Sequence, residues 1–268
     1  MSRGRAWIDA LADTPPRPAG VPSVLVADAA LGAERVRYVA VVPNPDGRFP
    51  RARRGEVGLE EGWNLAKAVR EVVDDDADDE RRAIVAVVDV PSQAYGRLEE
   101  LCGIHQACAA AADAYATARL AGHPVVALVV GRALSGGFLA HGYQANRILA
   151  LDDPGVTIHA MGKQSAARVT QRTVEELDAL AERNLPLAYD IATFARLGLL
   201  DRLIEGVADP DNPAPDDVEV VKGEVLRVIA EARSAPRDLS NRLESDDARQ
   251  SRAASIEVRK RLAAGWAS

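Results

Sequence analysis

Two nearly uninterrupted apolar segments constrain the fold of this 268-residue chain more than any other feature. Residues 83–90 and residues 125–130 consist mainly of valine, alanine, isoleucine and leucine. Strands that are buried on both faces have this composition, and parallel sheets are their common setting. Between the two segments, apolar side chains recur at helical spacing from Leu98 to Ala118, and Gly122 is expected to end that helix. Strand, helix and strand in this order predict an α/β domain with a parallel sheet.

The flanking segments add further elements to this domain. Residues 36–42 predict a strand, and the helical spacing that starts at Leu59 places Trp63 in the core. A proline-rich segment at residues 15–18 is expected to be a loop. Additional strands are predicted at residues 147–151 and 156–160, and helices at residues 7–12, 174–183, 188–197, 218–232 and 253–264.

This order of elements divides the chain into three predicted parts. Residues 1–34 form an N-terminal extension, and residues 35–208 form the α/β domain. Residues 209–268 form a C-terminal helical region, which is expected to pack on the main domain or on a partner.

Charge and composition exclude several classes of protein. The formal net charge of -7 leaves no basic surplus for a nucleic-acid partner. No segment is long and apolar enough to cross a membrane, and the N-terminus lacks the apolar stretch of a signal peptide. Cys102 and Cys108 are expected on different faces of one helix, so they do not predict a disulfide. Together these features predict a cytoplasmic protein.

Two clusters resemble metal sites but do not predict one. The acidic run at residues 74–80 has no interleaved glycine or histidine ligands, so it is interpreted as a solvated turn. The three-residue spacing of Cys102, His105 and Cys108 does not hold three ligands on one helix face. No metal is expected.

The most informative motif for chemistry follows the second apolar segment. The sequence Gly131-Arg132-Ala133-Leu134-Ser135-Gly136-Gly137 leads directly into a predicted helix. Glycines permit unusual dihedral angles and the close approach of a ligand to the backbone. A helix start offers unpaired N–H groups, so the turn can form an oxyanion pocket for an enolate derived from a thioester. The alternative is a purely structural turn.

This motif and its surroundings resemble the crotonase superfamily. The resemblance implies a crotonase-like (Clp protease/crotonase) α/β fold with additional C-terminal helices. It also implies that the backbone N–H of Gly136 is one oxyanion donor and that Gly137 supports the turn. The second donor is expected in the loop after the preceding strand, at Tyr95 or Gly96.

The loop that starts at Asp89 narrows the resemblance to the carboxyltransferase branch, although Ser92 replaces a glycine of that pattern. The segments at residues 91–96 and 159–166 are similar to malonate decarboxylase gamma subunits, and the similarity extends from Trp7 to about Leu203. It implies a carboxy-lyase that works with a beta subunit of related fold. The substrate would be a malonyl thioester on the prosthetic group of an acyl-carrier subunit, converted to the acetyl thioester through an enolate. The chain would carry no cofactor of its own.

Several polar side chains are candidates for substrate binding. Arg132 can meet an anionic group, and either His159 or Lys163 can hold a carboxylate or donate a proton. Ser135 is interpreted as a helix cap more readily than as a nucleophile, because its surroundings do not match Gly-x-Ser-x-Gly. The complete set of candidate binding residues is Ser92, Gln93, Arg132, Ser135, His159 and Lys163.

Three other functions remain open at this point. A biotin-dependent carboxyltransferase subunit could use the same pocket. A Clp-like serine peptidase would use Ser135 as its nucleophile, and a scaffold subunit would use the glycine turn only structurally. Hydration is disfavoured, because Leu139 and His159 stand where the hydratases of this fold need glutamates.

Overall fold

The computed structural model describes residues 1–76 and 81–266. The helices are α1 (Arg3–Leu11), α2 (Leu59–Asp75), α3 (Arg97–Leu101), α4 (Ile104–Ala121), α5 (Ser135–Ala140), α6 (Lys163–Thr170), α7 (Val174–Ala181), α8 (Ile191–Ala195), α9 (Pro215–Ser234), α10 (Asp246–Ser251) and α11 (Ala253–Trp266). The strands are β1 (Arg17–Ala19), β2 (Val21–Leu31), β3 (Glu34–Val41), β4 (Ala83–Val90), β5 (Val125–Leu134), β6 (Arg147–Leu151), β7 (Thr157–His159) and β8 (Arg202–Ile204).

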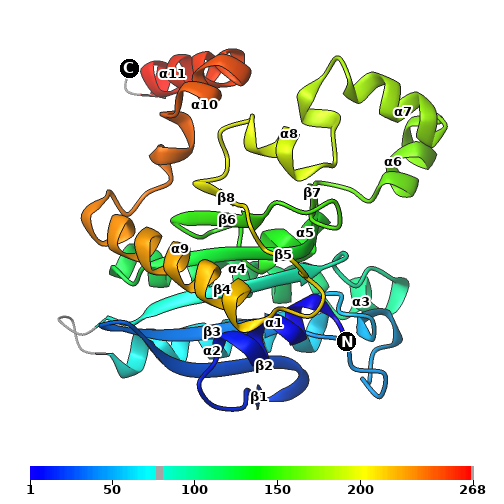
Figure 1. The fold of residues 1–268 in the computed structure, drawn as a ribbon. Coiled ribbons are helices and arrows are strands. Elements are labelled where there is room, and N and C mark those ends of the chain that lie inside the picture. The colour runs from blue at the N-terminus through cyan, green and yellow to red at the C-terminus, as the bar shows by residue number, and fades with distance from the viewer. Residues whose placement is uncertain (77–80, 267–268) are drawn as a thin grey trace.

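The described strands form one eight-stranded sheet in the order β1-β2-β3-β4-β5-β6-β8, and β7 pairs with the end of β5 (Figure 1). The pairs β1–β2 and β2–β3 are antiparallel, and the other pairs are parallel. In the parallel part, every strand points the same way, so the carboxyl ends of β4, β5 and β7 meet at one edge. Loops that leave this edge are well placed to form a site.

Helices cover both faces of this sheet. In Figure 1, α1 and α9 lie in front of the sheet, and α2 and α4 belong to a second layer in which they pack on each other. All eight residues of β4 are buried, as are all five of β6. Burial from both sides explains why these strands are apolar throughout rather than alternating.

The predicted parallel strands are confirmed, and the antiparallel edge was missed. β4 and β6 have the predicted bounds, β5 continues four residues beyond the expected end, and β3 begins two residues earlier than expected. The prediction of a loop at residues 15–18 is wrong at Arg17 and Pro18, which belong to β1. A proline is tolerated there because β1 is an edge strand. The predicted N-terminal extension therefore contributes two strands to the same sheet.

The predicted long helix after β4 is two helices. Gly103 has a φ of 81°, and this left-handed conformation separates α3 from α4. Leu98 and Leu101 consequently lie on α3 and are exposed, whereas Tyr115 and Ala118 lie on the buried face of α4. Trp63 was also misplaced, because its side chain on α2 is 50% exposed. Helical spacing identified the buried face of α4 but not the break at Gly103.

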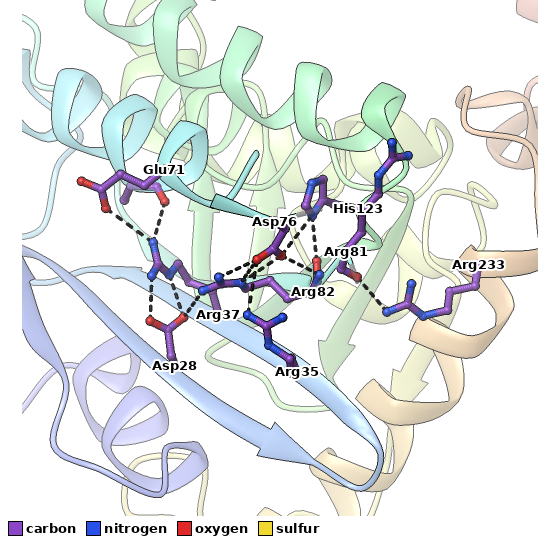
Figure 2. A network of polar contacts seen from close by, with 10 residues as sticks. Asp28, Arg35, Arg37, Glu71, Asp76, Arg81, Arg82, His123 and Arg233 are labelled. Atoms are coloured by element: carbon purple, nitrogen blue, oxygen red, sulfur yellow. Dashed lines mark hydrogen bonds and ion pairs between the residues drawn. The ribbon is translucent and has the colours of Figure 1, made fainter. Parts of the chain in front are cut away.

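The acidic run also departs from expectation at Asp76; residues 77–80 lie outside the described part of the chain. Asp76 is not solvated: its side chain is 1% exposed and pairs with Arg82 at 2.5 Å. Figure 2 shows how Asp28 and Asp76 then join Arg37 and Arg82 into one polar network, with Arg35 alongside. This network ties β2, β3 and the end of α2 to the start of β4.

The C-terminal helices differ from one another in packing. α9 contacts β5, β6 and β8, and its buried residues include Val221 and Ile229. α11 has no buried residue among those described. None of the described helices is long and apolar enough to cross a membrane.

Candidate active site

A cavity of about 810 Å³ opens at the edge where β4, β5 and β7 end. Four segments that are far apart in the sequence form it: the segment before α2, the loop after β4, the β5–α5 turn, and the segment from the end of β7 into α6. Its described lining residues are Arg51, Arg54, Glu56, Pro91, Ser92, Gln93, Ala94, Tyr95, Arg132, Ser135, Gly136, Ala160, Met161, Gly162, Ser165, Arg168 and Val169. Six of the ten predicted site residues are in this set: Ser92, Gln93, Tyr95, Arg132, Ser135 and Gly136.

The two glycines of the turn serve close packing rather than unusual dihedral angles. A Cβ at Gly137 would lie 2.4 Å from the backbone oxygen of Ser92 and 3.1 Å from the backbone nitrogen of Gln93. Only a glycine therefore allows α5 to approach the loop after β4 this closely. The left-handed conformation falls instead on Ser135, whose φ is 57°, an arrangement that stores about 1–2 kcal/mol of strain. Gly137 itself lies behind the cavity wall.

The backbone N–H of Gly136 points to the cavity side and donates to the Gln93 side-chain oxygen, Oε1, at 2.8 Å. The predicted oxyanion donor, the Gly136 N–H, is therefore already bonded to the side-chain amide oxygen of Gln93. The peptide of Ala94 is engaged elsewhere, because its N–H donates to the Val57 carbonyl oxygen at 2.8 Å. That bond fixes the loop after β4 to the segment that precedes α2.

Asp89, which was not predicted as a site residue, anchors Arg132 from behind. It is the second-last residue of β4, is buried, and accepts from the Arg132 N–H at 3.2 Å. Its Oδ1 is also 3.7 Å from Nε of the half-exposed Arg132 side chain. A Cβ at Gly131 would lie 2.4 Å from Asp89 Oδ1, so a glycine is required beside it. The sequence does single out Asp89, because it is a charged residue near the end of the otherwise apolar strand β4.

Arginine dominates the charge of the cavity. Arg51, Arg54, Arg132 and Arg168 line it, and Glu56 is the single carboxylate among the described lining residues. Glu56 is buried and occupied by Arg54, with Oε1 2.9 Å from the Arg54 guanidinium nitrogen Nη2. In a chain with a net charge of -7 this is a local reversal of sign, and it suits an anionic ligand. The basic segment at residues 51–54 thus forms one wall.

Four predicted site residues do not line the cavity. Lys163 pairs with Asp178 at 2.7 Å, and His159 stacks on Tyr189 with ring centroids 3.9 Å apart. Gly96 faces the Glu99 carboxylate, and Gly137 is covered by Ser92 as described above. Their roles in the site stay predictions.

Ser135 lines the cavity without the features of a peptidase nucleophile. It is not a helix cap either, because Leu134 occupies that position and no side-chain bond caps α5. His141, the nearest histidine in the sequence, faces away: its Nδ1 is 3.0 Å from the Tyr115 hydroxyl and its Nε2 is 3.1 Å from the Val87 carbonyl oxygen. No histidine is found among the described residues of the cavity wall.

The buried His141 makes a pH-dependent contribution to stability. Burial lowers the pKa of His141 to about 4. The unfolded chain binds a proton near pH 6.5 and the folded chain does not, so this contribution is complete above pH 6.5 and falls as the pH drops toward 4. At pH 5 we expect a loss of about 2 kcal/mol, from about 1.4 kcal/mol per pH unit. Urea unfolding of wild type and His141→Gln between pH 5 and 7.5 checks this. Equal slopes for the two chains would exclude His141 as the source.

Comparisons with known proteins agree on one family. The model of the family described as malonate decarboxylase gamma subunit matches residues 52–266. A chain of a Pseudomonas malonate decarboxylase hetero-tetramer, solved with coenzyme A, is 54% identical, with a TM-score of 0.92; the match covers 99% of this chain and 100% of that one. A chain of the Pseudomonas MdcD-MdcE hetero-dimer is 53% identical over the same shares, with a TM-score of 0.90.

More distant relatives identify the fold of the chain. The malonyl-S-ACP:biotin-protein carboxyltransferase MADD of Malonomonas rubra is 38% identical over 190 residues, which are 69% of this chain and 61% of that protein. The chain thus spans about three fifths of this curated relative. Transcarboxylase 12S, at 22% identity and a TM-score of 0.63, matches 87% of this chain and 42% of its own. The predicted crotonase-like fold is thereby confirmed, and the chain belongs to the malonate decarboxylase gamma subunit family.

Proposed function

We propose that this chain, together with a beta subunit, decarboxylates a malonyl thioester to the acetyl thioester. The observation that carries the proposal is the Gly136 N–H, which α5 holds at the wall of an arginine-lined cavity. A preorganised N–H of this kind stabilises negative charge on an oxygen, and loss of one such donor typically costs about 3–4 kcal/mol of transition-state stabilisation.

The reaction needs an electron sink more than it needs a base. The bond between the carboxylate carbon and the α-carbon breaks, and CO2 leaves. The electron pair of that bond forms the enolate, whose negative charge lies on the thioester oxygen. Gly136 donates to this oxygen, and the predicted second donor is a backbone N–H at Tyr95 or Gly96. A proton then adds to the α-carbon and gives the acetyl thioester.

The arginines of the cavity are the proposed binding partners of the substrate carboxylate and of the carrier arm. Arg132, oriented by Asp89, lies next to the Ser135–Gly136 turn and is the proposed partner of the malonyl carboxylate. Arg51, Arg54 and Arg168 add positive charge to the same cavity and suit a phosphate-bearing carrier arm. Crystals of the Pseudomonas relatives contain coenzyme A in one case and malonate in another.

The assembly and its location are part of the same proposal. The Pseudomonas relative forms an MdcD-MdcE hetero-dimer, and we infer a corresponding beta subunit here. We further infer that the thioester is carried on the prosthetic group of an acyl-carrier subunit, since the relative from Malonomonas rubra is named for malonyl-S-ACP. The exposed helix α11, within residues 209–268, is available for a partner. A cytoplasmic location fits the two free cysteines.

A direct assay tests this function. The chain and its beta subunit are co-purified, and CO2 release from a malonyl thioester is measured without biotin. We expect release by the pair and none by either subunit alone. No release by the pair would refute the proposal as stated.

A biotin-dependent carboxyltransferase is the second candidate, and the relative from Malonomonas rubra favours it because that protein is a malonyl-S-ACP:biotin-protein carboxyltransferase. The same assay separates the two functions. If CO2 is released only after a biotinylated carrier is added, the carboxyl group passes to biotin before release. The second candidate would then replace the first.

Gln93 makes a further prediction for substrate affinity. Its oxygen occupies the Gly136 donor, so an incoming thioester oxygen must displace it. Replacing Gln93 by alanine removes this competitor, which is worth about 0.5–1.5 kcal/mol, and we expect KM to fall by about 2- to 10-fold with kcat unchanged. Steady-state kinetics of the assembled enzyme measure this, with Gln106→Ala on α4 as the control outside the cavity. A higher KM in Gln93→Ala would mean that Gln93 binds the substrate instead of competing with it.

A further inference from the structure

A second cavity, of about 290 Å³, lies at the amino ends of the parallel strands, whereas the candidate active site lies at their carboxyl ends. Its wall includes the residues just before β4, β5 and β6, together with the carboxyl end of α4 and the segment at the end of α9. Since these three strands are parallel, their amino ends are roughly 25 Å from the edge that carries Gly136, the length of an eight-residue strand. The two cavities are therefore separate.

Positive side chains line this second cavity. Arg81, Arg119, Arg233 and Arg237 are in its wall together with His123 and Asn146, and no carboxylate is among the described lining residues. Figure 2 shows part of this wall, with Arg81 beside His123 and Arg233 reaching the Arg81 backbone oxygen. In an acidic chain, four arginines around so small a space are a marked local concentration of charge.

Two of these arginines make hydrogen bonds to backbone oxygens rather than ion pairs. Arg119 donates to the carbonyl oxygen of Gln144 at 3.0 Å and to that of Arg237, and Arg237 donates to the carbonyl oxygen of Leu120 at 3.2 Å. No direct ion pair with a carboxylate is found for either in the described part of the chain. Arg233, in contrast, pairs with Glu34 at 2.5 Å.

The pKa directions agree with this difference in partners. Burial lowers the pKa of Arg119, and the nearby charge of Asp238 offsets only part of that effect. The hydrogen bond with Glu34 raises the pKa of Arg233. A buried guanidinium group without a direct counter-ion favours the binding of an external anion.

Gly122 brings two of the guanidinium groups together. A Cβ at this position would lie 2.4 Å from Nη1 of Arg81 and 2.9 Å from Nη2 of Arg237. Both groups therefore approach the same point at the end of α4. The partial negative charge at a helix carboxyl end attracts one such group, but it is only about half an elementary charge. Two converging guanidinium groups present paired N–H donors, which is the arrangement that binds planar or tetrahedral oxyanions.

We propose that this arginine-lined cavity binds a phosphate group, either as free phosphate or as part of a small phosphorylated molecule. The cavity volume suits one or two phosphoryl groups, and guanidinium groups recognise them through paired N–H donors. The site is independent of the decarboxylase function proposed above. The proposed phosphate site thus gives the amino ends of the parallel strands a ligand that differs from the thioester substrate.

Calorimetric titration of the assembled enzyme with pyrophosphate and with inorganic phosphate, at constant ionic strength, tests the proposal. The background is R132Q/R168Q, because the first cavity also attracts anions. We expect pyrophosphate to bind in this background, and R237Q to weaken it at least tenfold. R237K keeps the charge without the paired donors and should be intermediate. R249Q on α10 is the matched control and should leave binding unchanged.

The experiment distinguishes anion binding from a purely structural role of these arginines. Arg237 is exposed, so R237Q is expected to fold, and thermal melting without ligand checks this. If these arginines only stabilise the helix ends, R237Q lowers the melting temperature and leaves pyrophosphate affinity unchanged, which would overturn the proposal. Absence of pyrophosphate binding in the R132Q/R168Q background would overturn it as well. Tighter binding of pyrophosphate than of phosphate assigns a diphosphate group, and equal binding assigns a single phosphoryl group.

Discussion

Replacement of Gly137 by alanine is expected to reduce kcat of the assembled decarboxylase by about 10²- to 10³-fold, the effect of losing an oxyanion donor. The added Cβ would lie 2.4 Å from the Ser92 carbonyl oxygen, which belongs to backbone and has little freedom to move. The loop after β4 and helix α5 must then separate, and this moves the Gly136 N–H away from its place at the cavity wall. Rapid-quench measurement of CO2 release gives kcat directly.

A second glycine provides the control for this prediction. Within a helix, alanine is more stable than glycine by about 1 kcal/mol. A Gly→Ala replacement in a helix is therefore harmful only where the added Cβ clashes with another atom. Gly223 lies within α9, and a Cβ there would meet nothing within 4 Å. Gly223→Ala should therefore be slightly stabilising and fully active. Wild-type kcat in Gly137→Ala would show that the close approach of α5 to the loop has no part in catalysis.

Replacement of Asp76 by asparagine is expected to destabilise the fold by about 3 kcal/mol, as does the loss of one partner from a buried ion pair. The Asp76 carboxylate is buried and receives hydrogen bonds from Nε and Nη2 of Arg82 and from the Arg82 N–H at 2.8 Å. Asparagine keeps the shape but removes the nearer counter-ion of the Arg82 guanidinium, whose side chain is 11% exposed, and leaves it only the longer contact with Asp28 at 3.3 Å. Urea unfolding at pH 7 measures the change.

The pH dependence gives this prediction a second measurement. Burial raises the pKa of Asp76, but the hydrogen bonds and charge of Arg82 outweigh it and hold that pKa below its usual value. The contribution is therefore complete above the unfolded pKa near 3.9, and it is lost as the pH falls through the lower folded value. Asp113→Asn on α4 removes an exposed pair with Arg70 and should cost less than about 1 kcal/mol. A change of the same size in Asp76→Asn would mean that the network contributes little.

The sequence predicted the parallel half of the sheet because burial on both faces leaves an uninterrupted apolar pattern, as in β4 and β6. β2 has such a pattern only at residues 24–27, between polar residues. It carries Ser23, which bonds to Glu61, and Asp28, which pairs with Arg37, so its polar residues resemble a loop until their partners are known. The partners lie 38 and 9 residues away, and local periodicity contains no information about them.

The site was predictable to a similar extent. The glycine pair and the loop after β4 carry local motifs, and the structure brings Gly136 and Gln93 into contact. Asp89 and Arg168 were missed because their place in the site depends on packing between segments that are distant in sequence. His159 and Lys163 were predicted to border the pocket, but His159 is the last residue of β7 and stacks on Tyr189, and Lys163 begins α6 and pairs with Asp178.

Hydrogen–deuterium exchange on the product tests the central claim most directly. If the site stabilises the enolate of a thioester, the assembled enzyme must also form that enolate from the acetyl thioester, because protonation is reversible. We predict that wild type incorporates deuterium from D2O into the acetyl methyl group in the absence of CO2, and that Gly137→Ala loses this exchange along with decarboxylation. An enzyme that releases CO2 from the malonyl thioester but exchanges no methyl hydrogen, or exchanges it equally after Gly137→Ala, would contradict an enolate held at Gly136.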